Sequence, residues 1–293
     1  MGSEPKTANL YSYGNRTYNE GHEKTRISAA SNVCLILFAN EANSRYRLVL
    51  AANRDEFYSR PTAPAAFWEE ASDVLAGKDL KSGGSWMGVT RNGKVAAVTN
   101  YRGLRKAWEV APSRGHLVSD YLMSRESPDM FIDKLCSRAL NYNGFNLLLG
   151  SAERLWWYSN LYDKPPHMIT SGIHGLSNHL LDTPWPKVER GKRALKHLLV
   201  GEKEITPEQV FSILEDRSPA ADTELPDTGV GLELERALSA SFIRTQAYGT
   251  RSSTVLLVER TGNLTFVERS FNPTDEAKKE TRYEFGIGSR YVS

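Results

Sequence analysis

Cys34 is the residue whose type and position best suit catalysis, because it begins an apolar, strand-like run over residues 34–39. An N-terminal thiol can act as a nucleophile when its own α-amine serves as the base, since an α-amine has a pKa of about 7.7–8.0. This chemistry requires a mature chain that begins at Cys34. The alternative is a buried structural thiol, which is the more usual state of a cysteine in a strand.

Four polar residues follow a second apolar run and are placed to serve such a nucleophile: Asn53, Arg54, Asp55 and Glu56. A guanidinium near a thiol favours the thiolate, so we expect Arg54 to activate Cys34. We expect Asp55 to orient the α-amine, and asparagine amides to bind a developing oxyanion. The alternative is that a strand simply ends in a polar turn.

The elements that must position these residues alternate between strands and helices. Apolar runs at 34–39 and 46–52 predict a hairpin buried on both faces, and Asn92-Gly93 between two further runs predicts a second hairpin. Helices are predicted from Ser113 to about residue 124, from Ser127 through Leu140, from 183 to about 200 and from 206 onward. A hairpin over 253–270 closes the chain. This order predicts an α+β sandwich with helices outside a mainly antiparallel sheet core.

Residues 1–33 differ from the rest of the chain. They are polar and show neither a helical nor an alternating period, so we expect a disordered or non-native extension. No linker or internal repeat interrupts the remainder. We therefore expect one domain over residues 34–293.

Composition excludes several classes of function. Lys plus Arg is 37 against 35 for Asp plus Glu, and this net charge of +2 provides no field for nucleic acid or an anionic membrane. No apolar run approaches the roughly 20 residues of a membrane span. The chain has 2 cysteines, far apart, which favours a reducing compartment, and we expect a cytoplasmic protein.

Cofactor motifs are also missing from the sequence. His174, His179 and Asp182 match no established metal-ligand spacing, and the glycines at 77–84 lack phosphate-loop spacing. The sequence therefore predicts no metal and no cofactor.

Eight segments of the chain resemble one known family. They are Cys-Leu-Ile-Leu-Phe-Ala at 34–39, Ala-Ala-Asn-Arg-Asp-Glu-Phe-Tyr-Ser-Arg-Pro-Thr at 51–62, Leu-Ala-Gly-Lys-Asp-Leu at 75–80, Gly-Gly-Ser-Trp-Met-Gly-Val-Thr at 83–90, Thr-Asn-Tyr-Arg at 99–102, Tyr-Asn-Gly-Phe-Asn-Leu-Leu at 142–148, Leu-Ser-Asn-His-Leu-Leu-Asp-Thr-Pro-Trp-Pro-Lys at 176–187 and Tyr-Gly-Thr-Arg-Ser-Ser-Thr-Val at 248–255. The chain is identified as a bacterial-type member of the NRDE-motif family, the family of the transport and Golgi organisation protein of animals.

The resemblance implies an N-terminal-nucleophile hydrolase fold, which is a four-layer αββα sandwich. Within that superfamily the chain looks most like the choloylglycine hydrolase and penicillin V acylase group. The catalytic residues implied by that likeness are Cys34, Arg54, Asp55, Asn178 and Arg251. The substrate and oxyanion positions fall to Asn53, Asn100 and His179.

One departure from the family concerns the start of the chain. Family members usually begin Met-Cys, whereas here Val33 stands before Cys34 and 33 residues precede the thiol. A start codon assigned too far upstream would explain this, because a GUG start would be read as valine. Self-cleavage before Cys34 is the alternative. We expect the native chain to begin at Cys34.

Two classes of function remain open. The first is a cysteine hydrolase of a non-peptide carbon–nitrogen bond, acting on a small amide with Cys34 as nucleophile. The second is a non-enzymatic carrier or chaperone for haem or an acylated ligand, as animal members have been tied to haem mobilisation and acyl-coenzyme A handling. A haem carrier would need an axial ligand, for which Cys34 and His179 are the candidates. The enzyme is favoured by the complete set Cys34, Arg54, Asp55, Asn178 and Arg251, because a carrier needs no oxyanion donors.

Overall fold

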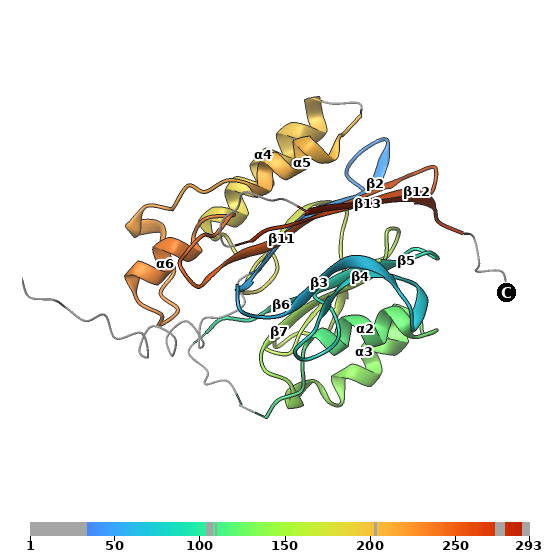
Figure 1. Ribbon diagram of the computed structural model, residues 1–293, viewed down its shortest axis with the longest axis horizontal. Helices are drawn as coiled ribbons and strands as arrows, with labels where there is room; N and C mark the ends of the chain where they lie inside the picture. The colour runs from blue at the N-terminus through green and yellow to red at the C-terminus, as the bar shows by residue number, and fades with distance from the viewer. Residues whose placement is uncertain (1–33, 104–107, 109, 202–203, 273–278, 289–293) are drawn as a thin grey trace, which may run out of the picture.

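Two antiparallel sheets lie face to face at the centre of the computed structural model, with helices on both outer faces (Figure 1). The structure describes residues 34–103, 108, 110–201, 204–272 and 279–288, so the extension expected over residues 1–33 lies outside it. Within these residues the layers run helix, sheet, sheet, helix. This arrangement confirms the αββα sandwich expected from the sequence.

The first sheet carries Cys34. In spatial order its described strands are β10 (Gly172–Leu176), β1 (Cys34–Asn40), β2 (Tyr46–Phe57), β11 (Tyr248–Glu259), β12 (Asn263–Ser270) and β13 (Lys279–Gly286). Helices α4 (Pro186–Gly201), α5 (Pro207–Leu214) and α6 (Leu232–Leu238) lie on its outer side (Figure 1).

The second sheet faces the first. Its described strands are, in spatial order, β3 (Thr62–Trp68), β4 (Ala71–Asp79), β5 (Met87–Thr90), β6 (Lys94–Asn100), β7 (Phe145–Ser151), β8 (Leu155–Ser159) and β9 (His167–Met168). Helices α2 (Gly115–Met123) and α3 (Pro128–Cys136) cover its outer side. Short 3₁₀ turns occur at Ala139–Asn141 and Asp222–Glu224.

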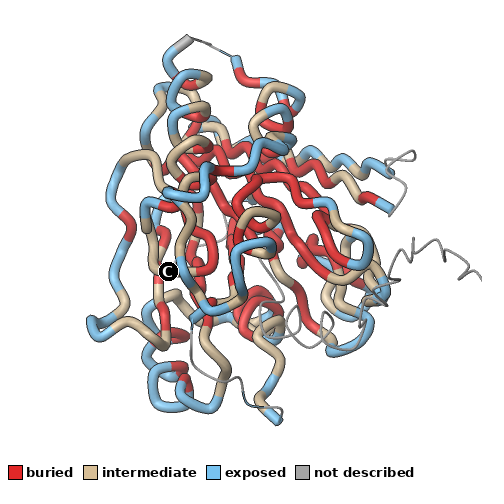
Figure 2. Tube along the Cα trace, turned by 90° about the vertical axis from the view of Figure 1, so that its left-hand side faces the viewer, coloured by how far each residue is buried: buried red, intermediate tan, exposed pale blue. Residues whose placement is uncertain are grey.

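Strand β1 is apolar on both faces because each face meets a different core. Ile36 and Phe38 point between the sheets, whereas Leu35 and Leu37 pack against α4 and α5. A strand between two cores must be apolar throughout. Figure 2 shows the result, with buried strand segments gathered at the centre and exposed segments at the periphery.

Helix boundaries followed the sequence signals only in part. Thr206 and Gln209 form the capping box expected at the start of α5. Helix α3, by contrast, ends at Cys136, and the predicted continuation through Leu140 is wrong. Leu140 lies in the following 3₁₀ turn with 70% of its surface exposed. Apolar spacing alone did not distinguish that turn from a further helical turn.

The loop between β4 and β5 requires glycine where its backbone meets the beginning of α2. Gly84 has φ of +72°, and a Cβ there would lie 2.4 Å from the carbonyl carbon of Gly115. Only a residue without a side chain allows both this φ and this approach. The contact places the beginning of α2, with Ser113 and Arg114, beside Ser85.

No helix in the described part of the chain has the length and apolar character that a bilayer span requires.

Candidate active site

The pocket at the beginning of β1 contains the Cys34 thiol. Its cavity volume is about 100 Å³, and it is lined by residues from both sheets, among them Cys34, Arg54, Asp55, Trp86, Asn100 and Arg114. That volume is below the range of roughly 300–1,000 Å³ typical of small-molecule sites. Four of the eight residues expected from the sequence therefore line one pocket.

Burial makes Cys34 a neutral thiol in the present chain. Desolvation, and next the negative charge of Asp55, raise the pKa of the thiol to about 12. Arg54 lies opposite Cys34 in the β1–β2 ladder and acts in the other direction, but its effect is the smaller one. Arg54 thus favours the thiolate, but burial outweighs one nearby guanidinium in this chain. The role expected of Arg54 in a chain that begins at Cys34 stays a prediction.

This difference in environment predicts the order in which the two cysteines react. In the full chain at pH 8, iodoacetamide should modify exposed Cys136 well before buried Cys34, because the thiolate is the reactive species. Peptide mass mapping of samples taken over time measures both sites. Cys34 should become reactive only in urea, whereas equal rates in the folded protein would contradict the burial of its thiol.

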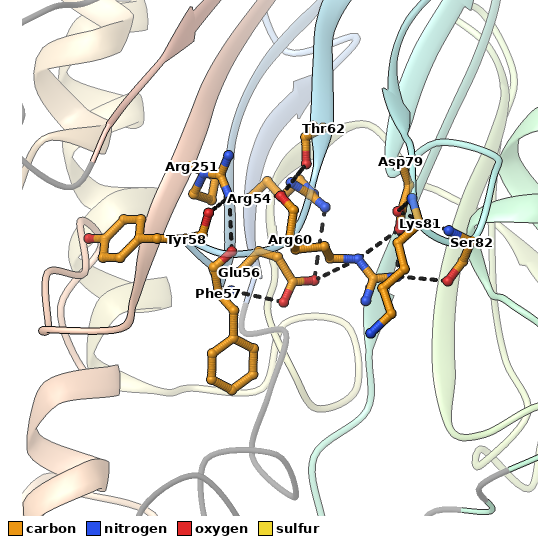
Figure 3. Close-up of polar contacts among 10 residues, drawn as sticks. All are labelled: Arg54, Glu56, Phe57, Tyr58, Arg60, Thr62, Asp79, Lys81, Ser82 and Arg251. Carbon is orange, nitrogen blue, oxygen red and sulfur yellow. Dashed lines mark hydrogen bonds and ion pairs between the residues drawn. The ribbon is translucent and has the colours of Figure 1, made fainter. Parts of the chain in front are cut away.

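Arg54 lies between the two sheets at one end of a chain of charges (Figure 3). Its guanidinium stacks on the Trp86 ring, 4.2 Å from the centroid, and its Nη1 donates to Thr62 Oγ1 at 3.1 Å. Its Nη2 lies 3.9 Å from Glu56 Oε2, and both side chains are more than nine-tenths buried. Arg60 continues the chain, with its Nε 3.5 Å from Glu56 Oε2. Sequence analysis gave Glu56 no role of its own and did not assign Arg60 to the site.

Asp55 projects to the opposite side of β2 from Arg54, toward α4. Its Oδ1 accepts a hydrogen bond from Thr250 Oγ1 at 2.6 Å. Burial raises the pKa of the carboxyl to about 7, although the positive charge of Lys187 opposes this shift. The Asp55 backbone also contacts the Cys34 thiol, so this carboxyl lies beside the N-terminal end of β1.

The asparagines expected at oxyanion positions differ in their placement. Asn100 lines the Cys34 pocket, and its carbonyl accepts a hydrogen bond from Asn178 Nδ2 at 2.9 Å. Ser177, the neighbour of Asn178, donates to the Cys34 carbonyl at 2.8 Å. Asn178 thus holds the backbone of Asn100, which forms part of the pocket wall.

Asn53 joins the sheet to its outer layer and lines a second, smaller cavity beside Cys34, not the pocket described above. Its Nδ2 donates to the carbonyls of Leu214 at 2.9 Å and Ser241 at 2.7 Å, and its Oδ1 accepts from Ser253 Oγ at 2.6 Å. These contacts occupy both amide atoms. Asn53 therefore has a structural role, and the oxyanion contact expected of it stays a prediction.

Arg251 acts as a clamp on the segment that follows β2. It lies at a register shift between Thr250 and Ser252 in the pairing of β11 with β2. Such a bulge changes the face of the sheet to which a side chain points. Its Nη1 donates to the carbonyls of Phe57, Tyr58 and Arg60 at 2.9, 3.0 and 3.1 Å (Figure 3). Arg251 lines a neighbouring pocket that shares Arg54 and Trp86 with the first, so the structure does not bring it to Cys34.

His179 is engaged by side chains outside the pocket lining. Its Nε2 lies 2.7 Å from the Tyr101 hydroxyl, and its Nδ1 lies 2.9 Å from Thr183 Oγ1. Elsewhere, His174 pairs with Asp182 at 2.7 Å. Within the described residues, no group of three or more His, Cys, Asp or Glu side chains is placed to hold a metal ion.

Arg114 was missed by sequence analysis although it approaches Cys34. It precedes α2, on the opposite side of the pocket from β1, and its Nη1 donates to the Gly144 carbonyl at 3.0 Å. Burial lowers the pKa of its guanidinium to about 10, and the Cys34 sulfur is the first of the groups that oppose this shift. Gly84 and Gly115, which let this segment approach, were the only sequence signal for it.

Comparison with known proteins identifies the family. The model of the family "Transport and Golgi organisation 2" matches residues 33–273. The chain belongs to the Transport and Golgi organisation 2 family. The human Transport and Golgi organization protein 2 homolog is 35% identical over 277 residues, covering 88% of this chain and 100% of the human protein. The narrower assignment to a bacterial-type NRDE member stays a prediction.

Solved structures with a related chain path include two amide hydrolases. A Caenorhabditis elegans N-acylethanolamine-hydrolyzing acid amidase ortholog has a TM-score of 0.44 and 10% identity, covering 76% of this chain and 92% of that one. Penicillin V acylase from Agrobacterium tumefaciens has a TM-score of 0.48 and 11% identity, with coverage of 87% and 86%.

Proposed function

We propose that this Transport and Golgi organisation 2 family member is a cysteine amidohydrolase when its chain begins at Cys34. The supporting observation is the shared pocket of Cys34, Arg54, Asp55 and Asn100 at the start of β1. Its substrate is a small amide with a non-peptide carbon–nitrogen bond.

In the proposed reaction the Cys34 α-amine takes the thiol proton while the sulfur attacks the amide carbonyl carbon. The tetrahedral intermediate then expels the amine, which leaves with the proton from the α-ammonium, and a thioester to Cys34 remains. Water hydrolyses the thioester with the same α-amine as base. A neutral resting thiol suits this sequence of steps, because the base acts only as the carbon–sulfur bond forms.

The other groups have distinct roles in this proposal. Asp55 orients the α-amine, and Arg54, Arg114 and Asn100 stabilise negative charge that develops between the sheets. Asn178 and Arg251 are positioning residues, since each holds a pocket wall through backbone carbonyls.

The haem-carrier alternative receives less support from the site. A soluble haem carrier needs an axial ligand, and both ring nitrogens of His179 already have hydrogen-bond partners in Tyr101 and Thr183. Cys34 is buried in a neutral form, whereas haem iron is bound by a thiolate.

A library of acylated amides tests the proposal directly. A chain produced to begin at Cys34 should release amine from at least one member of the library, detected by a fluorogenic amine reagent. Intact mass of the native protein should also show Cys34 as its first residue. Tight binding of haem or an acyl ligand by this chain, with no amine released from any member, would support the carrier and refute the hydrolase.

A further inference from the structure

A buried cluster of charged residues lies on the helix side of the first sheet, and the proposed reaction leaves most of it without a role. Lys187 occupies the first turn of α4, is only 2% exposed, and is the last residue of the family-like segment 176–187. Its Nζ has no hydrogen-bond partner among the described residues. A buried ammonium without partners is costly, and a cation at a helix N-terminus also opposes the helix dipole. Packing therefore gives no reason for a lysine here.

Asp55 carries the opposite charge that acts most strongly on this ammonium, although no hydrogen bond joins the two side chains. Its Oδ2 is likewise buried and lacks a hydrogen-bond partner among the described residues. Each of the two side chains is the first charged group that acts on the other. An isolated carboxylate at this depth would take up a proton. The positive charge of Lys187 therefore stabilises the ionised form of Asp55.

The remaining charges around Lys187 largely neutralise one another. Arg102, which follows β6, donates from Nη2 to Glu235 Oε2 of α6 at 3.1 Å, and both side chains are buried. Cys34 of β1 is the other titratable neighbour of Lys187, and its thiol is neutral. Among these neighbours of Lys187, Asp55 is therefore the one carboxylate that is not already paired with an arginine.

We propose that Lys187 is a positioning residue for Cys34, whose buried ammonium keeps the Asp55 carboxylate ionised beside the N-terminal end of β1. The catalytic consequence rests on the proposed function. An ionised Asp55 accepts a hydrogen bond from the Cys34 α-amine and holds it against the thiol, whereas a protonated Asp55 would not. The effect of Lys187 on the ionisation of Asp55 does not depend on whether the protein hydrolyses amides.

The direction of the pH effect follows from the two groups. Burial lowers the pKa of Lys187 and raises that of Asp55, while the charge of each group opposes the shift in the other. Removing the ammonium takes away the first of the effects that hold the pKa of Asp55 down, so this pKa should rise further. Asp55 should then remain protonated at pH 7.5.

Carboxyl carbon NMR of the full chain labelled at aspartate tests this inference, with Asp55→Asn to assign the signal. Lys187→Met should raise the pH midpoint of Asp55 by one pH unit or more. Lys187→Arg, which keeps the charge, should leave it near the wild-type value. Lys192→Met is the matched control, because Lys192 lies on the same helix but pairs with Asp182. An Asp55 midpoint unchanged in Lys187→Met would overturn the proposal.

A second measurement covers the case in which Lys187→Met does not fold. The Lys187 side-chain NMR signal should titrate at lower pH in Asp55→Asn than in the wild type, and no change there would overturn the proposal. With a turnover assay, Lys187→Met should move the acid limb of kcat/KM to higher pH. If the Asp55 midpoint moves as expected but no amide is ever hydrolysed, the pairing stands and the proposed function fails.

Discussion

One alanine added in front of Cys34 should abolish amide hydrolysis by a chain that otherwise begins at that residue. The addition converts the α-amine into an amide nitrogen, which cannot take the thiol proton. General base catalysis contributes about 10²–10⁴-fold, so kcat should fall by about 10³-fold or more. Amine release measured on the two chains, side by side, gives the comparison.

The control for this experiment is an alanine inserted after Gly262, in the turn between β11 and β12. A Cβ at Gly262 would have no neighbour within 4 Å, so that turn has room for change. The control should keep its activity, and Cys34→Ser should lose most of it while thermal stability is retained. Full activity in the chain that carries the extra alanine would eliminate the α-amine as the base.

Arg54→Ala should lower the free energy of unfolding by about 3 kcal/mol and also remove activity. The guanidinium lies between the sheets with its side chain 7% exposed, and the variant leaves the Glu56 carboxylate buried with only part of its compensation. Removing one partner of a buried ion pair costs about 3–5 kcal/mol, and the contact of Glu56 with Arg60 keeps our expectation at the low end of that range. Urea unfolding followed by tryptophan fluorescence measures the loss.

Arg282→Ala is the matched surface control, because Arg282 pairs with Glu284 while both side chains are at least half exposed. Exposed pairs contribute about 0.2–1 kcal/mol, so this variant should stay close to the wild type. A loss of stability in Arg54→Ala no greater than that in the control would show that the buried contacts of Arg54 with Glu56 contribute little to folding.

The sequence by itself determined the strand core and the order of the layers. The runs at 34–39 and 46–52 predicted β1 and β2 because a strand buried on both faces cannot carry polar residues in its middle. The capping box at Thr206 marked the beginning of α5, because those contacts form between residues three apart in sequence. Family-like segments then pointed to Cys34, Arg54, Asp55 and Asn100, which the structure gathers in one pocket.

The tertiary structure alone decided which of these polar residues reach the thiol and in what state. Arg114 comes to Cys34 from the beginning of α2, and Lys187 comes to Asp55 from the first turn of α4, so no local pattern announced either one. Arg251 lies at a bulge and lines a neighbouring pocket, and this placement depends on the pairing of two strands far apart in sequence. The raised pKa of the Cys34 thiol comes mainly from burial, because a thiolate is destabilised where water is excluded. Burial of this residue depends on the packing of all the layers of the fold, which no local stretch of sequence specifies.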